Sequence, residues 1–136
     1  ARLDLDFESP LFTAAPSRPF VLTTRNAPTD RRARAEQVAD VVEAGDQTLD
    51  LASALAELAD RGAGVVTCEG GPHLNGSLFS ADLLDELCLS LAPALVGGDS
   101  ARAVLGGLEA VQPLQLQRVL EDDGMLFLRY TRGSIE

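Results

Sequence analysis

The run Glu69-Gly70-Gly71-Pro72-His73-Leu74-Asn75 has the residue types of an anion-binding turn. The two glycines let the backbone approach a ligand closely, and Pro72 suits the first turn of a helix, where its missing N–H is not needed. The N–H groups that follow would point at an anion, and the helix dipole would add about 0.3–1 kcal/mol. Glycine also serves plain structural turns, so the neighbouring residues must decide between the two readings.

Two side chains of this turn carry chemistry of their own. Glu69 would repel a phosphate unless it faces a ribose hydroxyl or a ring N–H, and it also fits the role of an ordinary acid near a helix. His73 is the one histidine of the chain and is able to donate to a phosphate or to transfer a proton near neutral pH. A surface helix position without catalytic duty is the alternative for His73.

A second polar group follows the apolar run Phe20-Val21-Leu22. The hydroxyls of Thr23 and Thr24 and the guanidinium of Arg25 would stand at a strand end, where they suit a phosphate monoester. Arg25 also fits the description of a plain solvated charge. The sequence leaves these two readings of Arg25 open.

Other classes of site are disfavoured. The chain has 11 Arg and no Lys, which excludes a Schiff-base or Walker-type lysine. It shows no Ser-His-Asp pattern of a catalytic triad. It also lacks the spacing of His and Cys that metal sites use, so we expect no metal. Cys68 and Cys88 lie in apolar runs, and we expect them to be buried free thiols.

Charge and hydropathy restrict the partners. The net charge of -10 repels nucleic acid and anionic membranes at long range. No apolar stretch reaches the roughly 20 residues that cross a bilayer, and the start lacks a signal-peptide pattern, so we expect a soluble cytoplasmic protein. The chain opens on Ala1 without an initiator Met, and we expect it to be cut from something longer.

The elements expected in the first half form a βαβ pattern. A strand remnant at 2–7 and an irregular stretch at 8–19 precede a short buried strand ending at Thr23. A short helix over 31–37, a strand over 38–44 and an amphipathic helix from Asp50 to Arg61 follow. Continuous hydrophobicity then predicts that Val65–Cys68 is a central parallel strand, with Glu69 at its ligand-facing end.

The second half is expected to close the same sheet. A helix over 72–80 and a strand over 85–91 are followed by a loop from Pro93 to Gly98. Strands over 114–120 and 125–130 flank Asp123-Gly124, a pair that tolerates the positive φ of a hairpin turn. The sequence therefore predicts one domain over 1–136, a mixed α/β sheet with helices on both faces.

These motifs resemble a known family. The segment from Val65 through Gly70-Gly71-Pro72 to Pro93, with Gly97-Gly98, is similar to the C-terminal reductase domain of bacterial riboflavin biosynthesis, a pyrimidine reductase. The ending from Leu120 to Tyr130 resembles the actinobacterial branch of that family. The resemblance covers nearly all of this chain but only the latter part of a family domain, and it implies that the N-terminal third to half is absent.

The resemblance implies a fold, a reaction and an assembly. The fold would be dihydrofolate-reductase-like, a three-layer α/β/α arrangement whose mixed, mostly parallel sheet ends in a C-terminal antiparallel hairpin. The activity would be that of an NADPH-dependent oxidoreductase of riboflavin biosynthesis, which reduces the ribosyl group of 5-amino-6-(5-phosphoribosylamino)uracil to ribityl. The partners would be this phosphorylated pyrimidine and a second copy in a homodimer.

The resemblance also assigns site residues. It implies that Glu69 is the catalytic acid near substrate and nicotinamide, and it places two cofactor-binding groups: Gly70, Gly71, Pro72, His73, Leu74 and Asn75 on the diphosphate, and Thr23, Thr24 and Arg25 on the adenosine 2′-phosphate. His73 departs from the small hydroxyl residue of the family pattern. Two alternatives stay open: a related enzyme with another pterin or pyrimidine substrate, and a non-catalytic dinucleotide-binding fragment.

Overall fold

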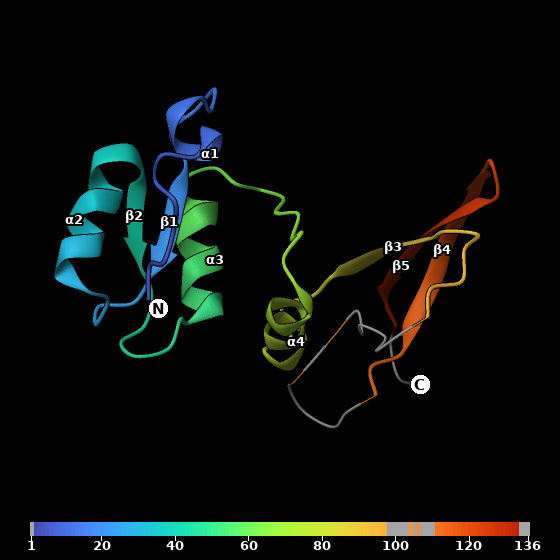
Figure 1. Cartoon of the computed structure of the whole chain (residues 1–136). Coiled ribbons are helices and arrows are strands. Elements are labelled where there is room, and N and C mark those ends of the chain that lie inside the picture. Colours follow the sequence, from blue (N-terminus) through green and yellow to red (C-terminus); the bar gives the residue numbers. More distant parts are fainter. Residues whose placement is uncertain (1, 98–103, 105, 107–110, 134–136) are drawn as a thin grey trace. The chain divides into compact units, whose positions relative to one another are not determined.

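The computed structural model describes residues 2–97, 104, 106 and 111–133. The chain divides into two compact units, Ala1–Thr67 and Cys68–Glu136, which are taken one at a time (Figure 1). The first unit contains α1 (Pro10–Thr13), β1 (Phe20–Thr23), α2 (Thr29–Val38), β2 (Asp40–Glu43) and α3 (Leu51–Asp60). The second contains α4 (Pro72–Ser80), β3 (Glu86–Leu91), β4 (Leu114–Asp122) and β5 (Met125–Arg132).

A parallel strand pair is the centre of the first unit. β1 pairs with β2 from Phe20 opposite Asp40 to Thr23 opposite Glu43, which confirms the predicted strand after Pro19. The second strand begins later than predicted, because α2 continues through Val38. The helix ends at Ala39, whose N–H donates to the Ala35 carbonyl at 2.8 Å.

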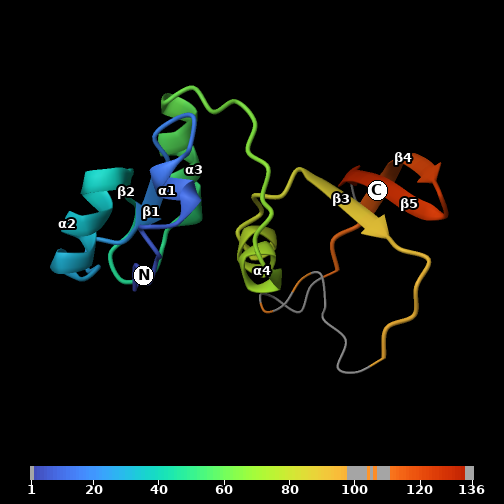
Figure 2. The same ribbon diagram turned by 45° about the horizontal axis from the view of Figure 1, so that its top comes forward.

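Helices cover both faces of this pair, as the sequence predicted. Both views show α2 on one side of the strands and α3 on the other (Figures 1 and 2). On the α2 side, Arg32 forms an ion pair with Glu43 of β2. On the α3 side, the Arg61 guanidinium lies 5.9 Å from the centre of the Phe20 ring, a cation–π contact. The strand pair thus lies between two helical layers.

The first 19 residues differ from the expectation. Residues 2–7 form no strand, and Leu3 has a left-handed backbone with φ of 49°, which interrupts an extended run. The stretch expected to be irregular contains the single-turn helix α1. Buried Leu3 and Phe7 nevertheless anchor this segment, and the Phe7 ring packs against Phe12 of α1 in a tilted contact, with 5.3 Å between the ring centres and 60° between the ring planes.

α3 begins with a side-chain cap. The Asp50 carboxylate accepts hydrogen bonds from the Ser53 N–H at 3.1 Å and the Ser53 hydroxyl at 2.8 Å. These two bonds lower the pKa of Asp50, the backbone bond most strongly. The helix ends where the sequence predicted, and Gly62 closes it with a φ of 94°.

This cap makes part of the stability depend on pH. The pKa of Asp50 is lower in the folded protein than in the unfolded chain, where it is about 4. The ionised carboxylate therefore adds to the free energy of unfolding above about pH 4, and this stabilisation is lost as the pH falls through the folded pKa. We expect Asp50→Asn, which keeps a capping side chain but does not titrate, to flatten the fall in the free energy of unfolding below about pH 4. Urea melts of both proteins at several pH values measure this, and identical slopes would contradict it.

The second unit contains a three-stranded antiparallel sheet in the order β3-β5-β4. The hairpin prediction is confirmed, because Asp123 and Gly124 adopt φ values of 49° and 76° between β4 and β5. The predicted helix over 72–80 is confirmed as α4 and the strand after Asp85 as β3. The segment from Pro93 is without helix or strand as far as Gly97, and Gly98 lies outside the described residues.

The register gives this sheet two different faces. One, here called the aliphatic face, is mostly apolar and carries Leu87, Leu89, Leu91, Leu114, Leu116, Val119, Leu126, Leu128 and Tyr130, with the charged residues Glu121 and Arg132 toward its ends. The other carries Glu86 and Arg129, whose charged groups meet at 2.6 Å. The hydrogen bond from Arg129 holds the pKa of Glu86 below its usual range. Several residues of the aliphatic face, among them Leu116 and Val119, are about half exposed.

Two expectations about burial are wrong. Val65–Cys68 is no buried strand: it pairs with no other segment that the structure describes, and Val65 is 89% exposed. An uninterrupted apolar run indicates that a segment favours burial, but a strand also needs neighbouring strands that pair with its backbone N–H and C=O groups. Cys68 and Cys88 are free but exposed. Cys68 is the last residue of this unpaired segment. Cys88 lies on the other face of the sheet from Leu87 and Leu89, because successive side chains of a strand point to opposite faces.

Candidate functional site

The Gly-Gly-Pro turn starts a helix, as the sequence predicted. Gly71 is the N-cap of α4 and Pro72 its first residue, and the Gly71 carbonyl accepts the N–H groups of Leu74 at 3.0 Å and Asn75 at 3.2 Å. Within the described residues the N–H groups of Gly71 and His73 have no acceptor. They are the donors that a helix start offers to an anion.

The two glycines of this turn have different surroundings. A Cβ on Gly70 would stand 2.5 Å from Leu74 Cδ2, so Leu74 packs where a side chain at residue 70 would lie. A Cβ on Gly71 would meet nothing within 4 Å. Gly70 therefore serves the packing of the turn, whereas the space at Gly71 is open to an approaching ligand.

The side chains around the turn are accessible. Glu69 and His73 are exposed, and within the part of the chain that the structure describes Glu69 forms no ion pair. The Cys68 thiol donates to Asn75 Oδ1 at 3.7 Å, which links the segment before the turn to α4. The turn thus combines free N–H groups with a solvent-facing carboxylate two residues before the N-cap.

The second predicted group lies at the carboxyl end of β1 in the first unit. Thr23 and Thr24 are almost fully buried, with 0% and 1% of their surface exposed. The Thr23 hydroxyl oxygen has no hydrogen-bond partner, and it is the one buried side-chain polar atom of the described residues in that state. Arg25 is exposed, but its Nη1 donates to Asp46 Oδ1 at 3.0 Å. Arg25 can reach an anion from solvent, whereas the two hydroxyls are enclosed.

Sequence reasoning missed the residues that shape this strand end. Gly45 follows β2 with a φ of 85°, and its carbonyl accepts the Arg25 N–H at 3.0 Å. A Cβ there would lie 2.3 Å from the Thr48 carbonyl oxygen, so only glycine fits. Asp46 then places its carboxylate on Arg25. A glycine directly after a strand and before an aspartate was the available signal.

Each unit, taken by itself, offers donors that suit a phosphate group. The free N–H groups at Gly71 and His73 suit a diphosphate, and Arg25 suits a phosphate monoester once Asp46 releases it. Among the described residues no group of three or more His, Cys, Asp or Glu is arranged to hold a metal ion. In the same residues no helix is long and apolar enough to cross a membrane.

Comparison with known proteins bears on the family. Residues 1–127 match the model of the RibD C-terminal domain. Two curated relatives carry the name 2,5-diamino-6-ribosylamino-4(3H)-pyrimidinone 5′-phosphate reductase. The one from Methanothermobacter thermautotrophicus is 37% identical over 84 residues, 62% of this chain and 39% of the relative. The one from Aquifex aeolicus is 32% identical over 89 residues, 65% of this chain and 40% of the relative.

A solved structure supports the fold. A pyrimidine reductase-like protein of Corynebacterium diphtheriae aligns with a TM-score of 0.77 and 23% identity, over 99% of this chain and 60% of that one. At this identity the likeness shows the fold alone, and it confirms an α/β fold like that of the reductase domain. The expected single, mostly parallel sheet is not what the described strands form, because the parallel pair β1-β2 and the antiparallel sheet β3-β5-β4 are separate. The chain spans about two fifths of the length of the two curated relatives.

Proposed function

This chain belongs to the RibD C-terminal domain family, and on that premise we propose that it is the NADPH-binding part of a pyrimidine reductase of riboflavin biosynthesis. The reaction is the reduction of the ribosyl group of 5-amino-6-(5-phosphoribosylamino)uracil to ribityl. The observation that carries the proposal is the turn at Gly71, an open helix start with free N–H groups inside the family-matched region. We propose further that the chain belongs to the actinobacterial branch of this family.

The first contact we propose is to the diphosphate of the cofactor. The N–H groups of Gly71 and His73 donate to it, and the dipole of α4 favours its charge. Gly70, Pro72, Leu74 and Asn75 shape the turn rather than supply side-chain contacts to phosphate. The exposed His73 side chain lies beside these donors, and backbone contact does not depend on its type.

The second contact is to the adenosine 2′-phosphate. Arg25 exchanges Asp46 for the phosphate, since a doubly charged phosphate is the stronger acceptor for a guanidinium. Thr23 and Thr24 join it only if their enclosed hydroxyls become accessible, so their part stays a prediction. The unpartnered Thr23 hydroxyl is a donor without an acceptor, which favours such a rearrangement.

In the proposed mechanism the protein orients the reactants. NADPH, when bound, supplies the hydride that reaches C1′ of the ring-opened sugar imine. Glu69 accepts a hydrogen bond from a hydroxyl of the substrate or cofactor and so fixes its position. No covalent nucleophile is required in this mechanism.

The role of Glu69 has a direct test. We expect Glu69→Gln, made in the full-length enzyme, to lower kcat about tenfold or more while changing NADPH affinity less than twofold, because the amide loses the charge that holds the hydroxyl. Steady-state kinetics and fluorescence titration of NADPH separate the two quantities. Glu57→Gln is the matched control, an exposed acid of α3 in the other unit. A Glu69→Gln enzyme with unchanged kcat would remove Glu69 from the mechanism.

A second candidate substrate has specific support. The curated relatives are named for a 2,5-diamino-pyrimidinone 5′-phosphate, which carries an amino group where the uracil compound carries an oxygen. Assays of the full-length protein with both compounds and NADPH decide between them. A chain that binds NADPH but reduces neither would instead be a non-catalytic dinucleotide-binding module, and failure to bind NADPH would overturn the proposal.

We also propose that the protein forms a homodimer. The aliphatic face of the second unit carries several half-exposed side chains, including Leu116 and Val119, and neighbouring exposed apolar side chains are typical of an interaction surface. Sedimentation velocity at several concentrations tests this, and a monomer throughout would contradict it.

A further inference from the structure

The backbone holds the Asp46 carboxylate beside Arg25. The Arg25 N–H donates to the Gly45 carbonyl at 3.0 Å, and the Asn26 N–H donates to the Asp46 carbonyl at 3.2 Å. A Cβ on Gly45 would lie 2.3 Å from the Thr48 carbonyl oxygen, so the turn before Asp46 admits only glycine. The segments that follow β1 and β2 are thus joined through their backbones, and this fixes the position of Asp46.

The pair of Arg25 and Asp46 offers two kinds of polar contact to a ligand. Arg25 Nη1 donates to Asp46 Oδ1 at 3.0 Å, and 70% of each side chain is exposed. Among the described residues, no group donates to the other carboxylate oxygen, Asp46 Oδ2. The guanidinium suits an anion, whereas the free carboxylate oxygen suits a hydroxyl group that donates to it.

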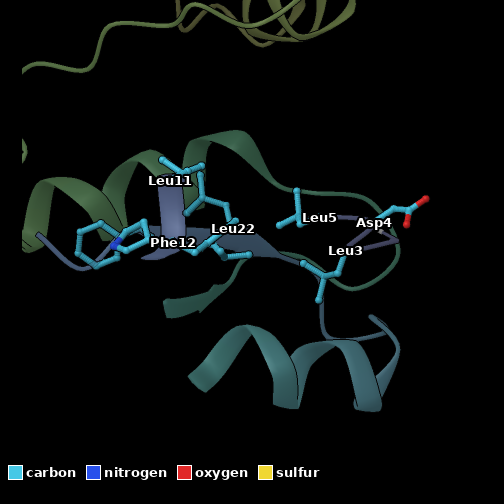
Figure 3. A pocket seen from close by; sticks show the side chains of 9 residues that line it. Leu3, Asp4, Leu5, Leu11, Phe12 and Leu22 are labelled. Carbon is cyan, nitrogen blue, oxygen red and sulfur yellow. The ribbon is translucent and has the colours of Figure 1, made fainter. Parts of the chain in front are cut away.

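The groove that β1 lines is apolar and offers no comparable contact (Figure 3). It has a volume of about 480 Å³, and its walls are mostly aliphatic or aromatic, as at Leu5, Phe12 and Leu22. The one charged residue that lines it is Asp4, whose carboxylate is paired with Arg31 at 3.0 Å. The hydroxyl or phosphate groups of a sugar therefore find suitable partners at the strand end rather than in this groove.

We propose that Asp46 is a specificity-determining residue for the cofactor: its carboxylate accepts a hydrogen bond from the ribose 2′-hydroxyl of NADH and opposes the 2′-phosphate of NADPH. In doubly wound dinucleotide-binding folds an acidic side chain binds the 2′-hydroxyl, whereas an arginine accommodates the 2′-phosphate. Here one strand end carries both groups, 3.0 Å apart. The inference rests on the proposed function, because it requires the adenosine ribose to lie at Arg25.

The Asp46 carboxylate acts on the two cofactors in opposite directions. For NADPH, Arg25 has to leave the carboxylate, and the doubly charged phosphate then lies near its negative charge. For NADH, the ion pair persists through Oδ1 while Oδ2 accepts the 2′-hydroxyl. Because both side chains are exposed, solvent screens these interactions and the expected changes in affinity are several-fold. The carboxylate therefore brings the affinities for NADPH and NADH closer together.

Asp46→Asn in the full-length protein tests the proposal. The amide keeps the size of the side chain but lacks the charge that holds Arg25 and repels phosphate. We expect NADPH to bind about threefold more tightly and NADH about threefold more weakly, so that the ratio of the two affinities rises about tenfold. Isothermal titration with each cofactor measures the two Kd values, and urea melts check that the variant is folded.

Asp40→Asn is the matched control. Asp40 begins β2, at the end of the strand away from Asp46, and forms an ion pair with Arg18 at 2.9 Å. The same substitution there removes an equivalent charge and should leave the ratio of affinities unchanged. The inference is overturned, and the proposed function stands, if Asp46→Asn keeps the wild-type ratio or if Asp40→Asn raises it equally. A wild-type protein that binds neither cofactor overturns both.

Discussion

Gly71→Asp is expected to weaken NADPH binding at least tenfold, about 1.4 kcal/mol or more, while the free energy of unfolding stays equal or rises. The backbone at Gly71 has a φ of -68° and open space around it, so a side chain fits. Aspartate is a preferred N-cap and interacts well with the helix dipole, which stabilises α4. The same carboxylate would stand beside the proposed diphosphate and repel it.

Gly71→Asn is the matched control for this change. Asparagine has the shape and the capping ability of aspartate without its charge, so the difference between the two variants isolates the electrostatic part. Isothermal titration with NADPH, alongside urea melts of each variant, measures both quantities. Equal NADPH affinity in Gly71→Asp and wild type would show that no phosphate binds at this helix start.

Gly45→Ala is expected to lower the free energy of unfolding by about 3 kcal/mol. The new methyl group would lie 2.3 Å from the Thr48 carbonyl oxygen and 3.0 Å from the Asp50 nitrogen, and both atoms belong to backbone. The left-handed φ of 85° adds further strain for a residue with a side chain. The loop would have to shift, which disturbs both the carbonyl that accepts the Arg25 N–H and the start of α3.

Gly62→Ala separates the two causes. Gly62 has a similar φ of 94°, but a Cβ there meets nothing within 4 Å. Its expected cost is therefore the backbone strain alone, about 1 kcal/mol. Chemical denaturation of both variants provides the comparison. If Gly45→Ala costs no more than Gly62→Ala, then the Thr48 carbonyl yields freely and the loop is softer than the structure indicates.

Local patterns in the sequence predicted the elements well. The strand from Phe20 to Thr23 and the helix from Pro72 to Ser80 have the bounds that the residues indicated. Asp123-Gly124 forms the expected hairpin turn. In each case the signal lies within a few residues: a glycine or proline with restricted backbone angles, or an apolar period that sets which side is buried.

Non-local features could not be predicted in the same way. Val65–Cys68 has the composition of a central strand, but pairing depends on a partner that local composition does not specify. The exposure of Cys88 depends on strand register, which sets the side of the sheet for every residue. The enclosure of Thr23 and Thr24 likewise depends on how tightly the neighbouring layers pack over the strand end.

The ion pair between Arg25 and Asp46 has a consequence for how any phosphate would be selected. An arginine that already holds a carboxylate binds phosphate by exchange of partners, so only the difference between the two interactions contributes to affinity. Added salt weakens both sides of this exchange. Discrimination between phosphorylated and unphosphorylated ligands should therefore change little with ionic strength, and removal of the Asp46 carboxylate should make that discrimination both larger and more sensitive to salt.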